Sequence, residues 1–171
     1  YYVSLLESKA QKEILDALNK VVSELCSMFQ GQAVFRIHGD RASELTGPGV
    51  QKHFAEKGIK VTCTPGFESN NNGRAERGIQ HIKNKARTML MSDNFSKKDR
   101  DLLWGAAVMH AAYTTRARVM GKQICPVAFG DRVTTRIKTD RLSSFGPRAR
   151  ESIYLGAGAD NASSGWLVGR K

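Results

Sequence analysis

Two carboxylates, Asp40 and Glu76, are the residues whose type and position best suit chemistry in this chain. Asp40 ends a predicted strand, where an α/β sheet presents side chains to ligands, and Glu76 opens a predicted helix, with 35 residues between the two. Two carboxylates brought together by a fold can hold Mg²⁺, and two such ions about 4 Å apart stabilise both oxygens of an in-line phosphoryl displacement. The alternative is a pair of solvated carboxylates, in which Glu76 only stabilises its helix by interacting with the helix dipole.

The elements that must position these carboxylates follow from hydrophobic periodicity. Strands are predicted at 1–6, 33–37 and 59–64, and the second of them runs directly into His38, Gly39 and Asp40. A helix beginning near Ser8 has one apolar face, formed by Ile14, Leu15, Leu18, Val21, Val22 and Leu25. A short helix before Gly58 turns Val50, Phe54 and Ala55 inward.

Two longer helices follow an asparagine-rich loop, Asn70 to Asn72, which is either a mobile loop touching DNA or an N-capping turn. The first, 75–91, has Ile79, Ile82, Ala86, Met89 and Leu90 on one side, beside a stripe of Glu76, Gln80, Lys83 and Arg87. The second, about 98–116, turns Leu102, Leu103, Ala106, Ala107 and Ala111 inward. Trp104 is expected to be a core anchor rather than a DNA-stacking platform.

The region after about Val119 is irregular, with strands expected near 152–155 and 165–168. The order of elements predicts an α/β fold with two regions, 1–118 and a C-terminal extension at 119–171. The basic residues of the C-terminal extension either bind DNA or are solvated loop charges, and the density of arginine favours DNA. They are Arg132, Arg136, Lys138, Arg141, Arg148 and Arg150.

The net charge of +11 and the pI near 9.9 favour a polyanionic partner, since each neutralised phosphate releases counterions. No run of 18 apolar residues is present, so no membrane span is expected. Three cysteines without CxxC spacing and four scattered histidines predict neither disulfides nor a zinc site, and are typical of an intracellular protein.

Six segments, in this order along the chain, carry a family resemblance: FRIHGDRASEL, TPGFESNNNGRAERG, DLLWGAAVMHAAYTTRAR, CPVAFG, LSSFG and SIYLGAGADNASSGWLV. Together they resemble the integrase of copia-type LTR retrotransposon polyproteins, over essentially the whole chain. The most specific segment runs from Asn72 to Arg77. With Asp40 before it, this segment is similar to the second half of the D,D-35-E signature of retroviral integrases and related transposases.

The resemblance implies a ribonuclease-H-like mixed sheet flanked by helices. Asp40 and Glu76 would be the second and third catalytic, metal-binding residues, with Mg²⁺ or Mn²⁺ in a two-ion site that also needs an upstream Asp. The reactions would be 3′-end processing and strand transfer, with the element ends and target DNA as partners. Residues expected to contact DNA are Arg41, Asn72, Arg74, Arg77, Gln80, Lys83 and Arg87.

The sequence also departs from the family pattern. Arg41 replaces a common asparagine after Asp40, and Gln80 replaces a common basic residue on the helix. The segment 1–6 resembles the third strand of the fold, so the first strands and the first catalytic Asp are expected upstream of Tyr1. The chain also begins like a segment cut from a longer polyprotein, and we expect no activity from it in isolation.

Other functions remain open. A catalytically decayed or domesticated DNA-binding derivative is favoured by Arg41 and opposed by the intact Asp40 and Glu76. A DDE transposase is opposed by CPVAFG and YLGAG, and an RNA-binding protein by the lack of aromatic residues in a sheet-face pattern. His38 is expected to be a polar strand-end residue rather than a catalytic one. A homo-oligomer, acting in the nucleus on host DNA and otherwise in a cytoplasmic particle, is expected by resemblance.

Overall fold

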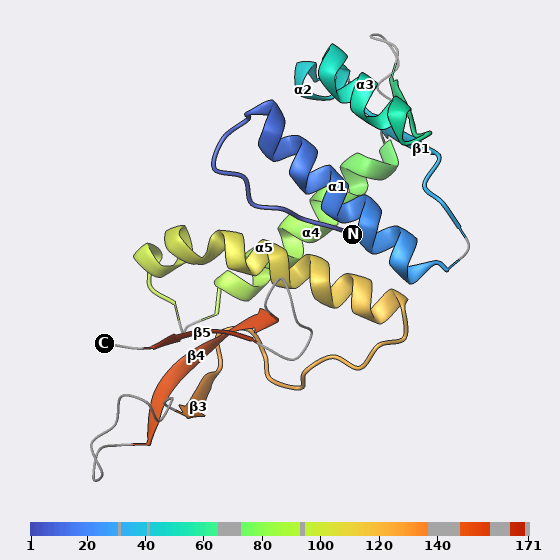
Figure 1. Cartoon of the computed structure of the whole chain (residues 1–171). Helices are drawn as coiled ribbons and strands as arrows, with labels where there is room; N and C mark the ends of the chain where they lie inside the picture. The colour runs from blue at the N-terminus through green and yellow to red at the C-terminus, as the bar shows by residue number, and fades with distance from the viewer. Residues whose placement is uncertain are drawn as a thin grey trace. The chain divides into compact units, whose positions relative to one another are not determined.

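The computed structural model of this chain describes residues 1–30, 32–40, 42–64, 73–92, 95–136, 148–157 and 165–169. The chain divides into two compact units, one formed by 4–78 and the other by 1–3 with 79–171 (Figure 1). Among the described residues, no helix combines the length and apolar character needed to cross a membrane. These two units do not test the boundary that the sequence predicts near residue 118, so that boundary stays a prediction.

The unit 4–78 is built around a parallel pair of strands, β1 (Arg36–Gly39) and β2 (Lys60–Cys63). Arg36 lies opposite Lys60 and Gly39 opposite Cys63. A parallel pair needs a crossover connection, which α2 (Ser43–Thr46) and α3 (Pro48–Glu56) supply. Figure 1 shows these two helices beside the strands. The predicted strands at 33–37 and 59–64 are therefore present, each shifted or shortened.

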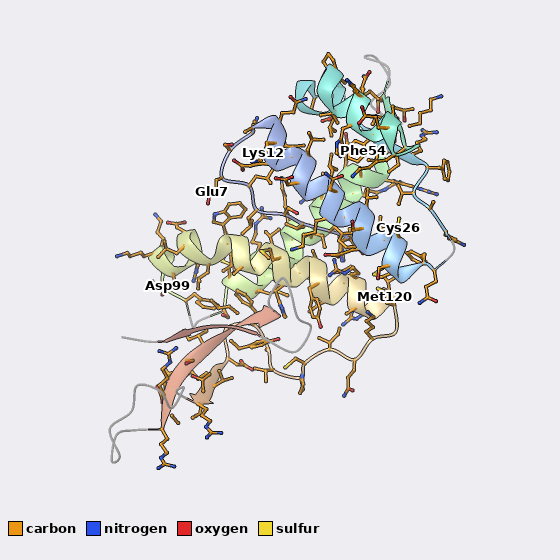
Figure 2. The ribbon with its side chains drawn as sticks, viewed as in Figure 1. Glu7, Lys12, Cys26, Phe54, Asp99 and Met120 are labelled. Carbon is orange, nitrogen blue, oxygen red and sulfur yellow. The ribbon has the colours of Figure 1, made fainter. Side chains whose placement is uncertain are left out.

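The core of this unit is formed by Val50, Phe54 and Ile59, of which Phe54 is fully buried on α3 (Figure 2). Helix α1 (Gln11–Met28) packs on it through Leu15, Leu18 and Val22, and all six residues of the predicted apolar face are half-buried. The prediction for this face is confirmed. Ala55, in contrast, is exposed, because a helix of this length turns only one stripe inward. Gly58, with φ +69°, ends the turn after α3 as predicted.

The segment Tyr1 to Leu6 forms no strand, so that prediction is wrong. A segment with strand propensity forms a strand only when a neighbouring strand hydrogen-bonds to its backbone. No described strand pairs with this segment. Its first residues instead pack by side chain. Val3 contacts the apolar core of the unit 1–3 with 79–171, and the Arg116 guanidinium lies 4.3 Å from the centre of the Tyr2 ring.

The second unit contains most of α4 (Gly73–Leu90), all of α5 (Lys97–Val119) and an antiparallel sheet. The sheet has the order β3 (Arg132–Arg136), β4 (Ala149–Ala157), β5 (Gly165–Gly169). Both helices and the last two strands match the predicted positions. Strand β3 was not predicted, because RVTTR has a single large apolar residue.

The core of this unit joins α4, α5 and the sheet. Ile82 and Ala86 of α4 meet Ala107, Ala111 and Ala112 of α5, and Leu155 of β4 meets the same cluster with Phe95 and Phe129. Helix α5 lies over the sheet (Figure 1). Ser96 and Asp99 form a reciprocal capping box at its start.

Three apolar residues of α4 and α5 are not where the sequence predicted them. Ile79 is 55% exposed, Leu102 is 71% exposed and Trp104 is 57% exposed. Most of the buried residues of α5 are small, and Leu102 and Trp104 lie outside this buried set. The α/β class is confirmed. The ribonuclease-H-like mixed sheet stays a prediction, because the described strands form one parallel pair and one separate antiparallel sheet.

Candidate nucleic-acid interface

Asp40 directly follows the carboxyl end of β1 and is exposed, as the sequence predicted. One of its carboxylate oxygens, Oδ1, accepts a hydrogen bond from the backbone N–H of Ala42 at 3.3 Å. That bond is local and orients the carboxylate at the turn after the strand. Arg41, expected to touch DNA or to pair with Asp40, lies outside the described residues.

The strand end beside Asp40 is held by a polar network across β1 and β2. The two ring nitrogens of His38 lie 2.9 Å from the Thr62 hydroxyl (Nδ1) and 3.3 Å from the Thr64 hydroxyl (Nε2). Arg36 donates to the same Thr62 hydroxyl at 3.0 Å. Both nitrogens of His38 are therefore engaged, which supports its interpretation as a polar strand-end residue.

Glu76 is exposed in the first turn of α4. It belongs to the same compact unit as Asp40, and no hydrogen bond or ion pair joins the two within the described part of the chain. Arg74 and Arg77 are exposed in the same turn. Asn70, Asn71 and Asn72, which precede this turn, lie outside the described residues.

The polar stripe of α4 is exposed along its length, at Gln80, Lys83 and Arg87. The side-chain oxygen of Asn84 accepts hydrogen bonds from Gln80 Nε2 at 2.8 Å and from Arg87 Nη1 at 3.3 Å. The sequence analysis missed Asn84. Its signal was the spacing, since residues three and four apart are neighbours on a helix surface. Asn84 thereby restricts two side chains that can reach an anion.

The donor set at Asp40 and Glu76 suits Mg²⁺ chemically, because two exposed carboxylates with water are the oxygen ligands this ion prefers. Among the described residues, no group of three or more His, Cys, Asp or Glu side chains could hold a metal ion together. The metal site therefore stays a prediction.

A groove of about 320 Å³ lies between α4 and α5, within the unit 1–3 with 79–171. Its walls are Lys83, Ala86, Arg87, Leu90, Met91, Arg100, Asp101, Trp104 and Val108. The sequence analysis missed its α5 residues because it placed Trp104 in the core. The signal was again the spacing, since Arg100, Trp104 and Val108 recur at four-residue steps along one stripe of a helix.

Lys85 joins the inner side of α4 to α5. Its Nζ donates hydrogen bonds to Thr114 at 2.8 Å and Thr115 at 3.1 Å. Burial, with a smaller effect from the charge of Arg118, lowers the pKa of Lys85. Lys85 thus links the two helices and does not belong to the exposed stripe, whose cations are Lys83 and Arg87.

The arginines of the C-terminal extension are exposed where they are described, at Arg132, Arg136, Arg148 and Arg150. Arg132 and Arg136 are the two ends of β3, and Arg148 and Arg150 lie at the start of β4. The two strands pair with Thr135 opposite Arg150 and Arg136 opposite Ala149. Lys138 and Arg141, together with Phe145 and Gly146, lie outside the described residues. DNA binding by these arginines stays a prediction.

No protein-family model matches the chain. Among solved structures, the chain is similar to the catalytic core domain of BIV integrase, with a TM-score of 0.47 and 12% sequence identity. The match covers 65% of this chain and 63% of that one. At this TM-score and identity, the likeness alone establishes neither a shared fold nor a shared activity.

Proposed function

We propose that the chain acts in DNA integration, as the polynucleotidyl transferase part of a retrotransposon polyprotein. The observation that carries the proposal is the exposed line of side chains on α4, in which Glu76 is followed by Gln80, Lys83 and Arg87. A carboxylate followed along one helix face by phosphate-binding groups suits a DNA backbone held beside a metal-dependent reaction.

In this proposal, Asp40 and Glu76 hold Mg²⁺ or Mn²⁺ together with an upstream Asp that the sequence resemblance implies. Bound there, the ions would neutralise charge on the attacking and leaving oxygens of the phosphodiester. Lys83 and Arg87 neutralise phosphates of the donor strand, and Gln80 donates a hydrogen bond without releasing a counterion. Element ends and target DNA are the partners. A homo-oligomer, and action in the nucleus on host DNA, belong to the same proposal.

The first test measures DNA affinity against salt concentration. We expect Lys83→Ala and Arg87→Ala each to weaken binding to any duplex and to reduce the slope of log K against log salt by about 0.9. Lys12→Ala is the matched control, since Lys12 is an exposed lysine of α1 outside the stripe (Figure 2). Equal slopes in all three variants would contradict a role for the stripe.

The second test measures strand transfer in Mg²⁺ or Mn²⁺, on the chain extended upstream so that it includes the first Asp. Glu76→Gln should abolish transfer while leaving duplex affinity within about twofold, because a neutral amide binds a divalent ion poorly. Glu56→Gln, an exposed glutamate at the end of α3, should leave both unchanged. Transfer that survives Glu76→Gln would contradict the catalytic role.

A second candidate function is a catalytically decayed or domesticated DNA-binding protein. Arg41 favours it, because a cation that directly follows Asp40 in the sequence would compete with a metal ion for the carboxylate. The two functions separate in the same assays. A decayed protein binds DNA with the stripe-dependent salt slope but shows no transfer in either metal, with or without Glu76→Gln.

A further inference from the structure

The groove between α4 and α5 combines an apolar floor with charged walls. Ala86, Leu90 and Val108 form apolar surface, and Met91 and Trp104 are 61% and 57% exposed beside them. An exposed tryptophan next to an exposed methionine leaves apolar area in contact with water, which a flat ligand could cover. The volume, about 320 Å³, lies at the small end of the range for ligand sites.

The charges of the groove favour an anion at one part and a hydrogen-bond donor at another. Three cations, Lys83, Arg87 and Arg100, face one anion, Asp101, so the lining carries a net charge of +2. Arg100 is poorly satisfied within the described part of the chain. Among the described residues, its Nε is buried without a hydrogen-bond partner, and its Nη1 donates to the Met91 sulfur, a weak acceptor, at 3.4 Å.

We propose that this groove binds an unpaired nucleotide of the DNA substrate. The base stacks on the Trp104 indole, and its flanking phosphates contact Lys83, Arg87 and Arg100. Basic residues around an aromatic face are the usual combination for single-stranded nucleic acid. This inference rests on the proposed function, since Lys83 and Arg87 belong to both the stripe and the groove.

Asp101 adds a preference among bases. A carboxylate in the groove repels phosphate and accepts a hydrogen bond from an exocyclic amino group, as carboxylates do with cytosine N4. Thymine has no exocyclic amino group and carries the carbonyl oxygen O4 where cytosine carries N4. The groove should therefore prefer unpaired dC to unpaired dT.

Two other occupants fit the groove less well. A second copy of this chain would bring its own positive charge, since the chain carries a net +11, against lining cations that already exceed the anions. An acidic peptide satisfies the cations but offers no planar ring system with amino donors for Trp104 and Asp101. Both are separate outcomes of the experiment.

The experiment compares the affinity of the chain for a blunt duplex with that for the same duplex carrying one extrahelical dC. Stacking of one base contributes about 1–3 kcal/mol, so we expect the bulged duplex to bind about tenfold tighter. Trp104→Leu should remove this preference and Trp104→Phe should keep most of it. Leu102→Ala, a change at an apolar residue of α5 that is 71% exposed outside the groove, should leave it unchanged. All three variants should bind the blunt duplex as the wild type does.

The outcomes separate this inference from the proposed function. Equal affinity for the two duplexes, or a preference that survives Trp104→Leu, overturns the nucleotide site while duplex binding still stands. Absence of binding to any DNA overturns both. Replacing the extrahelical dC by dT should weaken binding several-fold in the wild type, and Asp101→Ala should remove that difference.

Two further measurements test the other occupants. In sedimentation, a dimer that Trp104→Leu dissociates without changing the dC preference would assign the groove to a second copy. In fluorescence, a Trp166→Phe background leaves Trp104 as the only indole. Quenching of Trp104 by polyglutamate as strong as that by the bulged duplex would assign the groove to acidic peptides. Either result overturns the proposal.

Discussion

Gly156 of β4 lies against the imidazole of His110 on α5, so close that a β-carbon on the glycine would come within 2.5 Å of His110 Nδ1. Gly156 also has φ +104°, a conformation that residues with a side chain rarely adopt. His110 is 6% exposed and is surrounded by the rings of Tyr113, Phe129 and Tyr154. The contact fixes how closely α5 approaches the sheet.

Gly156→Ala should destabilise the protein by about 2–4 kcal/mol, because backbone strain and overpacking against His110 add. Gly121→Ala is the matched control: Gly121 has φ +64°, but nothing lies within 4 Å of its added carbon. It should cost only the strain, about 1 kcal/mol. Urea unfolding of both variants measures the difference. Equal losses of unfolding free energy in the two variants would mean that the His110 side chain moves aside without a cost in stability.

The stability of the protein should fall between pH 6.5 and pH 4 through His110. Burial, and then the charge of Lys85, lowers the pKa of His110 from 6.5 to about 4. The unfolded chain therefore takes up a proton as the pH falls through 6.5, whereas the folded protein does not until about pH 4. The loss should be about 3 kcal/mol across this window and should level off below it.

His110→Phe isolates this contribution, because phenylalanine keeps a ring among the aromatic neighbours and does not titrate. Unfolding free energies of the wild type and the variant, measured by urea titration from pH 7 to pH 4, should diverge as the pH falls. Parallel curves would show that the histidine titrates normally in the folded protein.

Lys85→Met should raise the pKa of His110, since it removes the nearby positive charge. The pKa should stay below 6.5, because burial, the larger cause, remains. The loss of the Lys85 hydrogen bonds to Thr114 and Thr115 should cost about 1 kcal/mol. An NMR titration of the His110 ring in both proteins checks the direction. An unchanged pKa would mean that Lys85 does not act on His110.

Much of the scaffold could be predicted from periodicity, because the long helices have regular apolar stripes. The helix predicted at 75–91 is α4, and its inward residues Ile82 and Ala86 are buried as expected. Asp40 after a strand and Glu76 in a first helical turn follow from the same patterns. A metal site formed by the two carboxylates stays a prediction, because no local pattern determines how segments far apart in the sequence pair.

The sequence predictions failed in two places. One is helix α5, which packs against two other elements, and the other is the segment Tyr1 to Leu6, which has no described partner strand. Helix α5 packs on α4 and on the sheet through alanines, so Leu102 and Trp104 lie outside despite their apolar side chains. Apolar residues are often exposed, so a large one does not mark the inward face when small residues provide the contacts. Tyr1 to Leu6 has strand-like composition and no described partner strand.

Asn84 should affect DNA binding without being a phosphate ligand. It is a positioning residue, because its side-chain oxygen accepts from both Gln80 and Arg87 and so restricts their rotamers. Asn84→Ala should weaken duplex binding about two- to fivefold while leaving the salt slope within error, since no cation is lost. Arg87→Ala, in contrast, should reduce that slope. A thermodynamic cycle separates the roles, because Asn84→Ala should have a smaller effect when Arg87 is already alanine. Additive losses in the double variant would show that Asn84 contacts DNA independently, and a reduced slope in Asn84→Ala would contradict the positioning role.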